Sequence, residues 1–192
     1  MMPSRVIAEK KRLRAHFLAQ RATIPAAERA VLDAALCRHI AAHPAFSACD
    51  TLLCFSPVRD EPDLTALYEL ARERGIKTAF PICTGVQMHF HTIAHAHELE
   101  TGRFGIPTPP KDAPLAPIGA HTLCLVPALA ASKKGERLGY GGGFYDRFLA
   151  DFKGTSMLPI YAALTCDSLP HEDTDLAVSI ILTEKGELLQ DG

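Results

Sequence analysis

The stretch LVPALAASKKGERLGYGGGFYDRFL, residues 125–149, combines an apolar strand, a glycine-rich loop and the start of a helix. Five glycines fall within nine residues, at Gly135, Gly139, Gly141, Gly142 and Gly143. Ordering so much glycine costs backbone entropy, and such loops occur where backbone N–H groups must approach an anion closely. A helix N-terminus adds a positive dipole end, and Lys133, Lys134 and Arg137 add charge. The pattern predicts a phosphate-binding loop, with a flexible surface loop as the alternative.

Two familiar phosphate motifs do not fit this stretch. It contains no GxxxxGK[ST], which excludes a Walker-type loop. The GxGxxG pattern fails because Phe144 stands where its third glycine would be, and the loop lies far from its strand for a Rossmann turn. No nucleophile elbow is evident either, and Cys124 lies in the middle of a strand, where a thiol is expected to be buried and inert.

Strands and helices alternate on both sides of this stretch. Apolar runs predict strands at 51–57, 76–82, 121–129, 157–165 and 178–183. Helical periodicity predicts helices at about 4–21, 25–43, 64–74 and 144–152, with Asp63 capping the third. Residues 86–93 alternate like an antiparallel edge strand, and proline-rich residues 101–121 are expected to form an irregular loop. This order predicts an α/β fold with three layers: a mostly parallel twisted sheet with helices on both faces, in a single domain over residues 1–192.

Composition places the chain among ordinary globular proteins. It has 192 residues, of which 47% are hydrophobic and 22% charged, with a formal net charge of −2. This balance excludes broad polybasic attraction to nucleic acid or membrane. No apolar segment follows the charged N-terminus, so a secretory signal is not expected. No apolar run reaches the length of a membrane-spanning helix. The six cysteines form no CxxC pair, which indicates reduced thiols. We expect a cytoplasmic monomer that binds neither nucleic acid nor membrane.

Cations lie on the inward side of the first predicted helix. On a helical wheel, Lys10, Arg14 and Arg21 fall between two sets of apolar residues, whereas Arg5 and Arg12 point away. One interpretation is that the inward cations snorkel over apolar neighbours. The other is that the helix delivers them to an anionic ligand.

Three carboxylates are candidates for the site. Asp146 is the third residue of the helix after the glycines, where it either stabilises the helix N-terminus or binds Mg²⁺ beside phosphates. Asp175, near the last strand, is a candidate second Mg²⁺ ligand or a loop residue. Glu61 follows the first strand at an edge where parallel sheets bind ligands, and no structural duty explains it.

The segment HFHTIAHAH contains four histidines, at His89, His91, His95 and His97. Alternate histidines on a strand could share a face and bind Zn²⁺. No cysteine or acid stands at ligand spacing within the segment, so exposed strand and loop histidines are expected.

Residues 126–149 resemble the signature of the 5-formyltetrahydrofolate cyclo-ligase family, also called methenyltetrahydrofolate synthetases. Family members carry a pattern like PxxAFDxxGxRLGxGxGYYDRxL, and this chain has PALAASKKGERLGYGGGFYDRFL. The opening KKRLRAHFLAQR, the segment FSPVRDEPDL, the run GRFGIPTP and the ending LPHEDTDLAVSIILT are similar to further family motifs. The resemblance therefore extends over nearly the whole chain.

The resemblance implies a reaction. ATP and 5-formyltetrahydrofolate become 5,10-methenyltetrahydrofolate, ADP and phosphate, with Mg²⁺ as cofactor. The formyl oxygen attacks the γ-phosphate to give an N5-iminium phosphate, N10 attacks that carbon, and phosphate leaves. Such chemistry needs positioning and charge neutralisation more than a protein nucleophile.

The resemblance also implies roles for individual residues. The residues it assigns to ATP are Lys10, Arg14, Gly135, Arg137, Leu138, Gly139, Gly141, Gly142, Gly143 and Phe144. It assigns Glu61, Tyr140 and Tyr145 to the folate, Asp146 and Asp175 to Mg²⁺, and catalysis to Arg137 and Tyr145.

Several positions depart from the family pattern. Ala131 and Ser132 replace the aromatic residue and the acid of AFD, Thr108 replaces the Glu of FGIxEP, and Ser179 replaces the Asp of VDxIIT. Gly142 stands where some members carry a lysine. These departures leave open a folate- or nucleotide-binding paralogue with weak or no turnover. A sugar-phosphate isomerase or deacylase on a similar scaffold is a further alternative, but it needs an acid–base pair that the sequence does not reveal.

Overall fold

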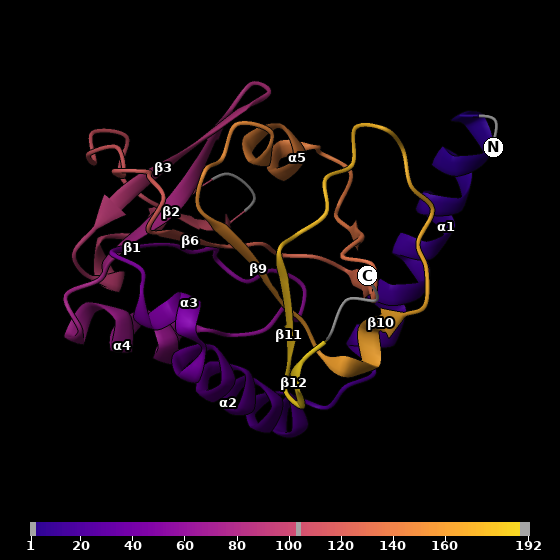
Figure 1. Ribbon diagram of the computed structural model, residues 1–192, viewed down its shortest axis with the longest axis horizontal. Coiled ribbons are helices and arrows are strands. Elements are labelled where there is room, and N and C mark those ends of the chain that lie inside the picture. The colour runs from indigo at the N-terminus through magenta and orange to yellow at the C-terminus, as the bar shows by residue number, and fades with distance from the viewer. Residues whose placement is uncertain (1–2, 103–104, 189–192) are drawn as a thin grey trace.

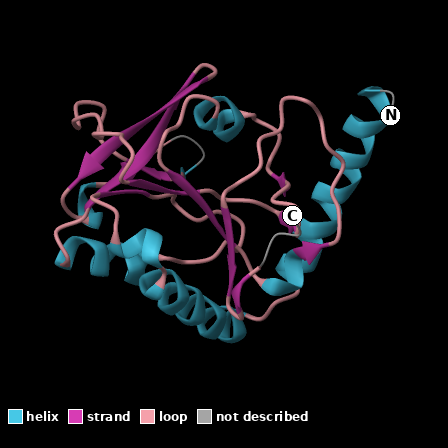
Figure 2. Cartoon of the chain, in the orientation of Figure 1, coloured by secondary structure: helices cyan, strands magenta, loops and turns pink. Residues whose placement is uncertain are grey.

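A seven-stranded sheet runs through the computed structural model, which describes residues 3–102 and 105–188, in the order β12-β11-β9-β6-β1-β2-β3 (Figures 1 and 2). The strands are β1 (Thr51–Leu53), β2 (Lys77–Thr84), β3 (Gln87–Ile93), β6 (Thr122–Leu125), β9 (Thr155–Pro159), β11 (Ile180–Thr183) and β12 (Gly186–Glu187). The inner strands β2, β1, β6, β9 and β11 are parallel, and β3 and β12 pair antiparallel at the edges. The predicted mostly parallel sheet, with residues 86–93 as an antiparallel edge strand, is confirmed.

Helices lie on both sides of the sheet. They are α1 (Pro3–Ala22), α2 (Ala26–Ala42), α3 (Pro44–Ser47), α4 (Thr65–Glu73) and α5 (Phe144–Leu149). In Figure 1, α2, α3 and α4 run along one face of the sheet and α5 lies against the other. Helix α1 stands beside the sheet and contacts the short helix η3 (Ala162–Leu164). This arrangement confirms the predicted α/β fold with helices on both faces.

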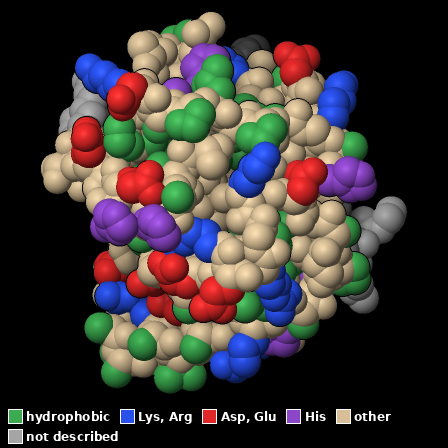
Figure 3. Space-filling model, turned by 90° about the vertical axis from the view of Figure 1, so that its left-hand side faces the viewer, with side chains coloured by type: hydrophobic (Ala, Val, Ile, Leu, Met, Phe, Trp, Pro, Cys, Tyr) green, Lys and Arg blue, Asp and Glu red, His purple; other side chains and the backbone are tan. Residues whose placement is uncertain are grey.

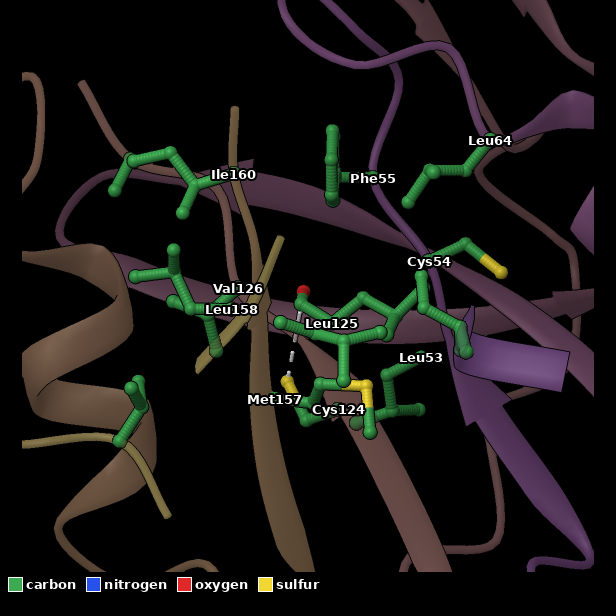
Figure 4. Close-up of a cluster of buried hydrophobic side chains, with 14 of the residues drawn as sticks. Leu53, Cys54, Phe55, Leu64, Cys124, Leu125, Val126, Met157, Leu158 and Ile160 are labelled. Carbon is green, nitrogen blue, oxygen red and sulfur yellow. Dashed lines mark hydrogen bonds between the residues drawn. The ribbon is translucent and has the colours of Figure 1, made fainter. Parts of the chain in front are cut away.

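The inner strands are apolar because both of their faces are covered. All four residues of β6 and all three residues of β1 are buried. Figure 4 shows how side chains from neighbouring strands, among them Leu53, Leu125 and Leu158, gather with Leu64 from the start of α4. This core fixes the strand ends from which the loops of the site emerge.

The region between β6 and α5, predicted as the end of a strand followed by a long glycine-rich loop, contains further strands. It contains β7 (Ala130–Ser132) and β8 (Arg137–Leu138), which form a hairpin, and β10 (Thr165–Cys166) pairs with β7. The predicted strand at 157–165 is therefore split, because the chain leaves the main sheet after β9 and enters this second sheet. The described part of the predicted loop at 101–121, residues 101–102 and 105–121, is largely irregular, apart from a short pairing of β4 (Glu100–Thr101) with β5 (Pro107–Thr108).

The face at the β3 edge carries acidic, basic and histidine side chains mixed with hydrophobic ones (Figure 3). His89, His95 and His97 are exposed, as predicted, and the rings of the last two stack with centroids 5.2 Å apart. His91 is half-buried, with Nδ1 2.6 Å from the Ala113 carbonyl oxygen. In the described ranges, no group of three or more histidine, cysteine or acidic residues is arranged to hold a metal ion.

The six cysteines are free thiols, as predicted. Complete burial raises the pKa of Cys54 and Cys124, so both thiols are protonated at neutral pH. Among the helices of residues 3–102 and 105–188, none has the length and apolar character needed to cross a membrane.

Gly154 provides a test of the packing behind α5. A Cβ atom at this position would collide with the Thr122 carbonyl oxygen and lie 2.6 Å from Cζ of Phe152. We expect Gly154→Ala to lower the free energy of unfolding by about 1–3 kcal/mol, as overpacking of a well-filled interior does. Urea unfolding followed by circular dichroism measures this change. Gly119→Ala is the matched control, because a Cβ there meets no atom within 4 Å. Equal effects of the two substitutions would contradict the explanation.

Candidate active site at the glycine-rich loop

A cleft of about 800 Å³ lies beside the glycine-rich loop. Its walls come from α1, β8 and the loop that follows it, α5, and residues 172–176. Pro127, just after β6, and Pro81 and Cys83, in the second half of β2, line its inner side. The cleft therefore lies at the carboxyl ends of parallel strands, where open α/β sheets bind their ligands.

Nearly all residues that the sequence assigned to ATP line this cleft. They are Lys10, Arg14, Arg137, Leu138, Gly139, Gly141, Gly142, Gly143 and Phe144. Gly135 does not line it. Its N–H donates to the Ser132 carbonyl in the turn that connects β7 to β8. Gly135 thus belongs to the hairpin that carries Arg137. Because it does not line the cleft, a direct contact of this glycine with ATP is not supported.

The glycine-rich loop packs against the Arg14 side chain. Arg14 Nε donates to the Gly139 carbonyl oxygen at 2.8 Å. Gly141 has a φ of 94°, and a Cβ there would lie 3.2 Å from Cζ of Arg14. Gly143 has a φ of 65° and directly precedes α5. Glycine is therefore needed for backbone conformation at both positions and, at Gly141, for close approach of a cation.

Arg137 and Asp146 form an ion pair in the wall of the cleft. Arg137 Nη2 lies 2.6 Å from Asp146 Oδ1, and the side chains are 5% and 23% exposed. Arg137 Nε is buried with no hydrogen-bond partner among the described residues. The Leu176 N–H also donates to Asp146 Oδ1, at 3.2 Å. Asp146 lies in the first turn of α5, but its carboxylate faces Arg137 and the 172–176 segment as well as the helix terminus.

Lys10 lies between two other carboxylates of the cleft lining. Its Nζ is 2.5 Å from Glu172 Oε2 and 2.5 Å from Asp175 Oδ2, and its side chain is 6% exposed. The Glu172 N–H donates to the same Asp175 oxygen at 2.7 Å. The inward placement of Lys10 predicted from the helical wheel is confirmed. Glu172 was not singled out from the sequence, although it stands in the ending LPHEDTDLAVSIILT.

Glu61 lies near Tyr140, a residue of the main cleft, but does not itself line that cleft. It borders a smaller hollow of about 320 Å³ between the start of α2 and residues 57–63. Glu61 Oε2 accepts from the Val58 N–H at 2.9 Å, and Oε1 has no hydrogen-bond partner among the described residues. Burial raises the pKa of Glu61, and the Val58 N–H, the Arg21 charge and the nearby Tyr140 hydroxyl oppose the rise.

The two tyrosines assigned to the folate lie on the lining of the main cleft. Tyr140 is 38% exposed and its oxygen accepts from Arg21 Nη2 at 2.5 Å. Burial raises the pKa of Tyr140 to about 12. The Tyr145 hydroxyl is buried with no partner among the described residues, and burial raises its pKa well above the usual value. Both phenols are therefore neutral at physiological pH and act as hydrogen-bond donors or acceptors, not as bases.

Four of the departures from the family pattern, at Ala131, Ser132, Thr108 and Ser179, lie outside the cleft lining, whereas Gly142 is part of it. Ala131 is fully buried in β7. The Ser132 hydroxyl donates to Glu136 Oε2 at 2.7 Å within the β7–β8 hairpin. The Thr108 hydroxyl donates to the Pro81 carbonyl oxygen. These residues thus serve the framework around the site, and their changes remove no group that faces the cleft.

Comparison with known proteins agrees with the geometry. The family model of the 5-formyltetrahydrofolate cyclo-ligase family matches residues 6–184. A 5-formyltetrahydrofolate cyclo-ligase of Mycolicibacterium smegmatis is 32% identical over 143 residues, covering 70% of this chain and 74% of the relative. One from Escherichia coli K12 is 26% identical over 148 residues, with 73% and 81% covered.

A solved structure gives the same assignment. The NMR structure of Aquifex aeolicus 5,10-methenyltetrahydrofolate synthetase superimposes with a TM-score of 0.82 at 27% identity, covering 95% of this chain and 94% of that chain. The family model, which matches residues 6–184, includes the glycine-rich signature as well as the motifs near the two ends of the chain, in α1 and up to the end of β11. This chain therefore belongs to the 5-formyltetrahydrofolate cyclo-ligase family.

Proposed function

We propose that this chain uses ATP to convert 5-formyltetrahydrofolate into 5,10-methenyltetrahydrofolate, with release of ADP and phosphate. The observation that carries the proposal is the convergence of Lys10, Arg14 and Arg137 on a cleft bounded by glycine backbone. Guanidinium and ammonium groups beside exposed backbone N–H groups suit a polyphosphate. Family membership supplies the identity of the two substrates.

The nucleotide phosphates are proposed to lie between α1 and the glycine-rich loop. Lys10 and Arg137 are 6% and 5% exposed, so their charges are poorly screened by water. Both are now paired with carboxylates, and an incoming triphosphate would compete with those carboxylates for them. Arg14 already lies against Gly139 and Gly141, where it would meet the same phosphates.

The reaction requires orientation more than a protein nucleophile. In the proposed sequence the formyl oxygen of the folate attacks the γ-phosphorus of ATP and ADP leaves, giving an N5-iminium phosphate. N10 then attacks the formyl carbon and loses its proton to solvent, and phosphate leaves as the ring closes. Burial raises the pKa of the Cys124 thiol and the Tyr145 phenol, which fits a site without a nucleophilic side chain. The protein's contribution would be alignment of the reactants and stabilisation of phosphate charge.

The folate is proposed to contact Tyr140, Tyr145 and Glu61. The buried Tyr145 hydroxyl and Glu61 Oε1 both lack partners among the described residues, and unpaired buried polar atoms are costly unless a ligand satisfies them. A carboxylate such as Glu61 can accept paired N–H donors of an aminopyrimidinone ring.

Asp146 and Asp175 are proposed to hold Mg²⁺. Their carboxylates lie on adjoining segments, since the backbone N–H of Leu176, the residue after Asp175, donates to Asp146. Mg²⁺ sites commonly use one or two carboxylates together with substrate phosphates, so this donor set fits the ion without a third protein ligand. When bound, the ion would neutralise phosphate charge. The carboxylates would then exchange their present pairing with Lys10 and Arg137 for the metal.

Asp146→Asn separates the metal role from helix stabilisation. We expect the variant to need roughly tenfold more Mg²⁺ for half-maximal activity, because a neutral amide is a weaker ligand for a hard cation. Mg²⁺ titration of activity and isothermal titration calorimetry of Mg²⁺–ATP binding measure this change. Asp151→Asn, on an exposed residue just after α5, is the control. Parallel losses of stability and activity with an unchanged Mg²⁺ requirement would support helix capping instead.

The direct test of the proposal is the appearance of the methenyl-folate absorbance when the purified protein is given 5-formyltetrahydrofolate, with and without ATP. Product formation only with ATP supports the cyclo-ligase. Product formation without ATP would favour an isomerase-type activity. Tight folate binding with no turnover would favour the non-catalytic paralogue.

A further inference from the structure

Arg21, at the end of α1, is completely buried and holds three loops together. Its Nε donates to the Arg59 carbonyl oxygen at 2.9 Å, Nη1 to the Ala128 carbonyl oxygen at 3.3 Å, and Nη2 to the Tyr140 hydroxyl oxygen at 2.5 Å. Arg59 follows β1, Ala128 follows β6, and Tyr140 belongs to the glycine-rich loop. One guanidinium thus connects the segments that carry Glu61 and Tyr140, two of the three proposed folate-binding groups.

The turn before Glu61 is held in an unfavourable backbone conformation. Arg59 and Asp60 have φ values of 48° and 63°, which non-glycine residues adopt at a cost. The Arg21 hydrogen bond holds the Arg59 carbonyl, and an ion pair of 2.9 Å between Arg29 and Asp60 holds the next residue. Because Glu61 follows directly, these contacts fix where its carboxylate lies.

Arg21 is also the buried positive charge near Glu61. The acceptors of its hydrogen bonds are all neutral, so Glu61 offers it a compensating negative charge. The other ionisable groups near Glu61 are Tyr140, Tyr145 and, around the smaller hollow, Arg29, Arg59, Asp33, Asp60 and Asp63. Arg21 lowers the pKa of Glu61 against the effect of burial and so favours the carboxylate form.

The hydrogen bond to Tyr140 sets the direction in which that phenol can donate. Arg21 occupies a lone pair of the Tyr140 oxygen, so the O–H proton is left for another acceptor. The guanidinium carbons of Arg21 and Arg59 lie 6.0 and 5.9 Å from the centroid of the Tyr140 ring, which restricts the ring as well.

We propose that Arg21 is a positioning residue for folate recognition, which fixes Tyr140 and the Glu61 turn relative to each other by bonding to both at once. Arg21 does not line the cleft in which the phosphates and Mg²⁺ are proposed to bind. The assignment of Tyr140 and Glu61 to the folate rests on the proposed function, whereas the coupling of the two loops does not.

The coupling is tested first without ligand, by amide hydrogen exchange on the wild type, Arg21→Lys, Arg21→Gln and Arg12→Gln. The lysine variant keeps the charge but cannot reach three acceptors. Arg12 is the control, because it lies exposed on the same helix and, among the described residues, pairs only with Glu9. We expect faster exchange at residues 57–61 and 139–143 together in both Arg21 variants, with β1 and β6 unchanged. Unchanged exchange, or faster exchange in one loop alone, would overturn the coupling.

The recognition role is tested by calorimetric binding of 5-formyltetrahydrofolate and, separately, of ATP. We expect Arg21→Lys to weaken folate binding about tenfold, as loss of a charged hydrogen bond does, and ATP binding less than twofold. In Arg21→Gln the loss of folate affinity on acidification should begin at a higher pH, because Glu61 loses the charge that lowers its pKa. Equal weakening of both ligands, or an unmoved pH profile, would overturn the inference. Absence of folate binding by the wild type would contradict the proposed function, while hydrogen exchange still decides the coupling.

Discussion

Replacing Arg137 by alanine is expected to lower kcat/KM for ATP about 10- to 150-fold, the equivalent of a charged hydrogen bond of about 1.5–3 kcal/mol. The side chain is 5% exposed, its Nη2 reaches Asp146, and its Nε has no partner among the described residues. Arg137 lines a cleft whose walls also include Lys10 and glycine backbone. A phosphate oxygen that reached the unpaired Nε would satisfy it, so loss of the guanidinium should weaken the use of ATP.

Arg137→Lys distinguishes the geometry of the guanidinium from its charge. Lysine keeps the positive charge but cannot bond to Asp146 and a phosphate with two separate N–H groups, so an intermediate loss is expected. Steady-state kinetics with ATP varied at saturating folate measures both variants, with Arg12→Gln as the control for loss of a surface cation. An unchanged KM and kcat for ATP in Arg137→Ala would remove this residue from the phosphate site.

Replacing Lys10 by methionine is expected to affect stability as well as ATP binding. The substitution leaves Glu172 and Asp175 facing each other without the ammonium group that now lies 2.5 Å from each. Breaking a buried pair by removing one partner costs about 3–5 kcal/mol. The carboxylates are 35% and 26% exposed, so solvent screening reduces this, and we expect a loss of about 2–3 kcal/mol. Thermal unfolding and equilibrium dialysis with ATP measure the two effects.

Mg²⁺ should also change the melting temperature of Lys10→Met. Without Lys10, the two carboxylates can be neutralised by a divalent ion, so Mg²⁺ should raise the melting temperature of Lys10→Met more than that of the wild type. Lys11→Met is the matched control, because Lys11 is the next residue of α1 and is exposed. The same melting temperature for Lys10→Met and Lys11→Met would show that the pairing with Glu172 and Asp175 contributes nothing.

Patterns local in sequence predicted much of the fold and part of the site. The apolar runs of β1, β6 and β11 gave the parallel sheet because strands covered on both faces must be apolar throughout. The periodicity of α1 placed Lys10 and Arg21 inward, and both are buried. The glycines and Arg137 were assigned to one loop because they lie close together in the chain.

Features that depend on distant pairing were not predictable in this way. The β7–β8 hairpin lacks an alternating pattern, and its pairing with β10 joins residues more than thirty positions apart. Glu172 pairs with Lys10 of α1, 162 positions away in the sequence, and this contact forms only when the 172–176 segment folds against α1. The same holds for Arg21, whose inward direction was visible but whose three acceptors lie on three separate loops.

The central claim is that one cleft couples ATP cleavage to closure of the folate ring. The most direct measurement follows ADP and the methenyl-folate absorbance in the same reaction, with 5-formyltetrahydrofolate, ATP and Mg²⁺, for the wild type and for Arg137→Ala. We expect the wild type to form one ADP for each methenyl product and Arg137→Ala to slow both equally. Ring closure without ADP formation, or no product from a folded wild type that binds both substrates, would contradict it.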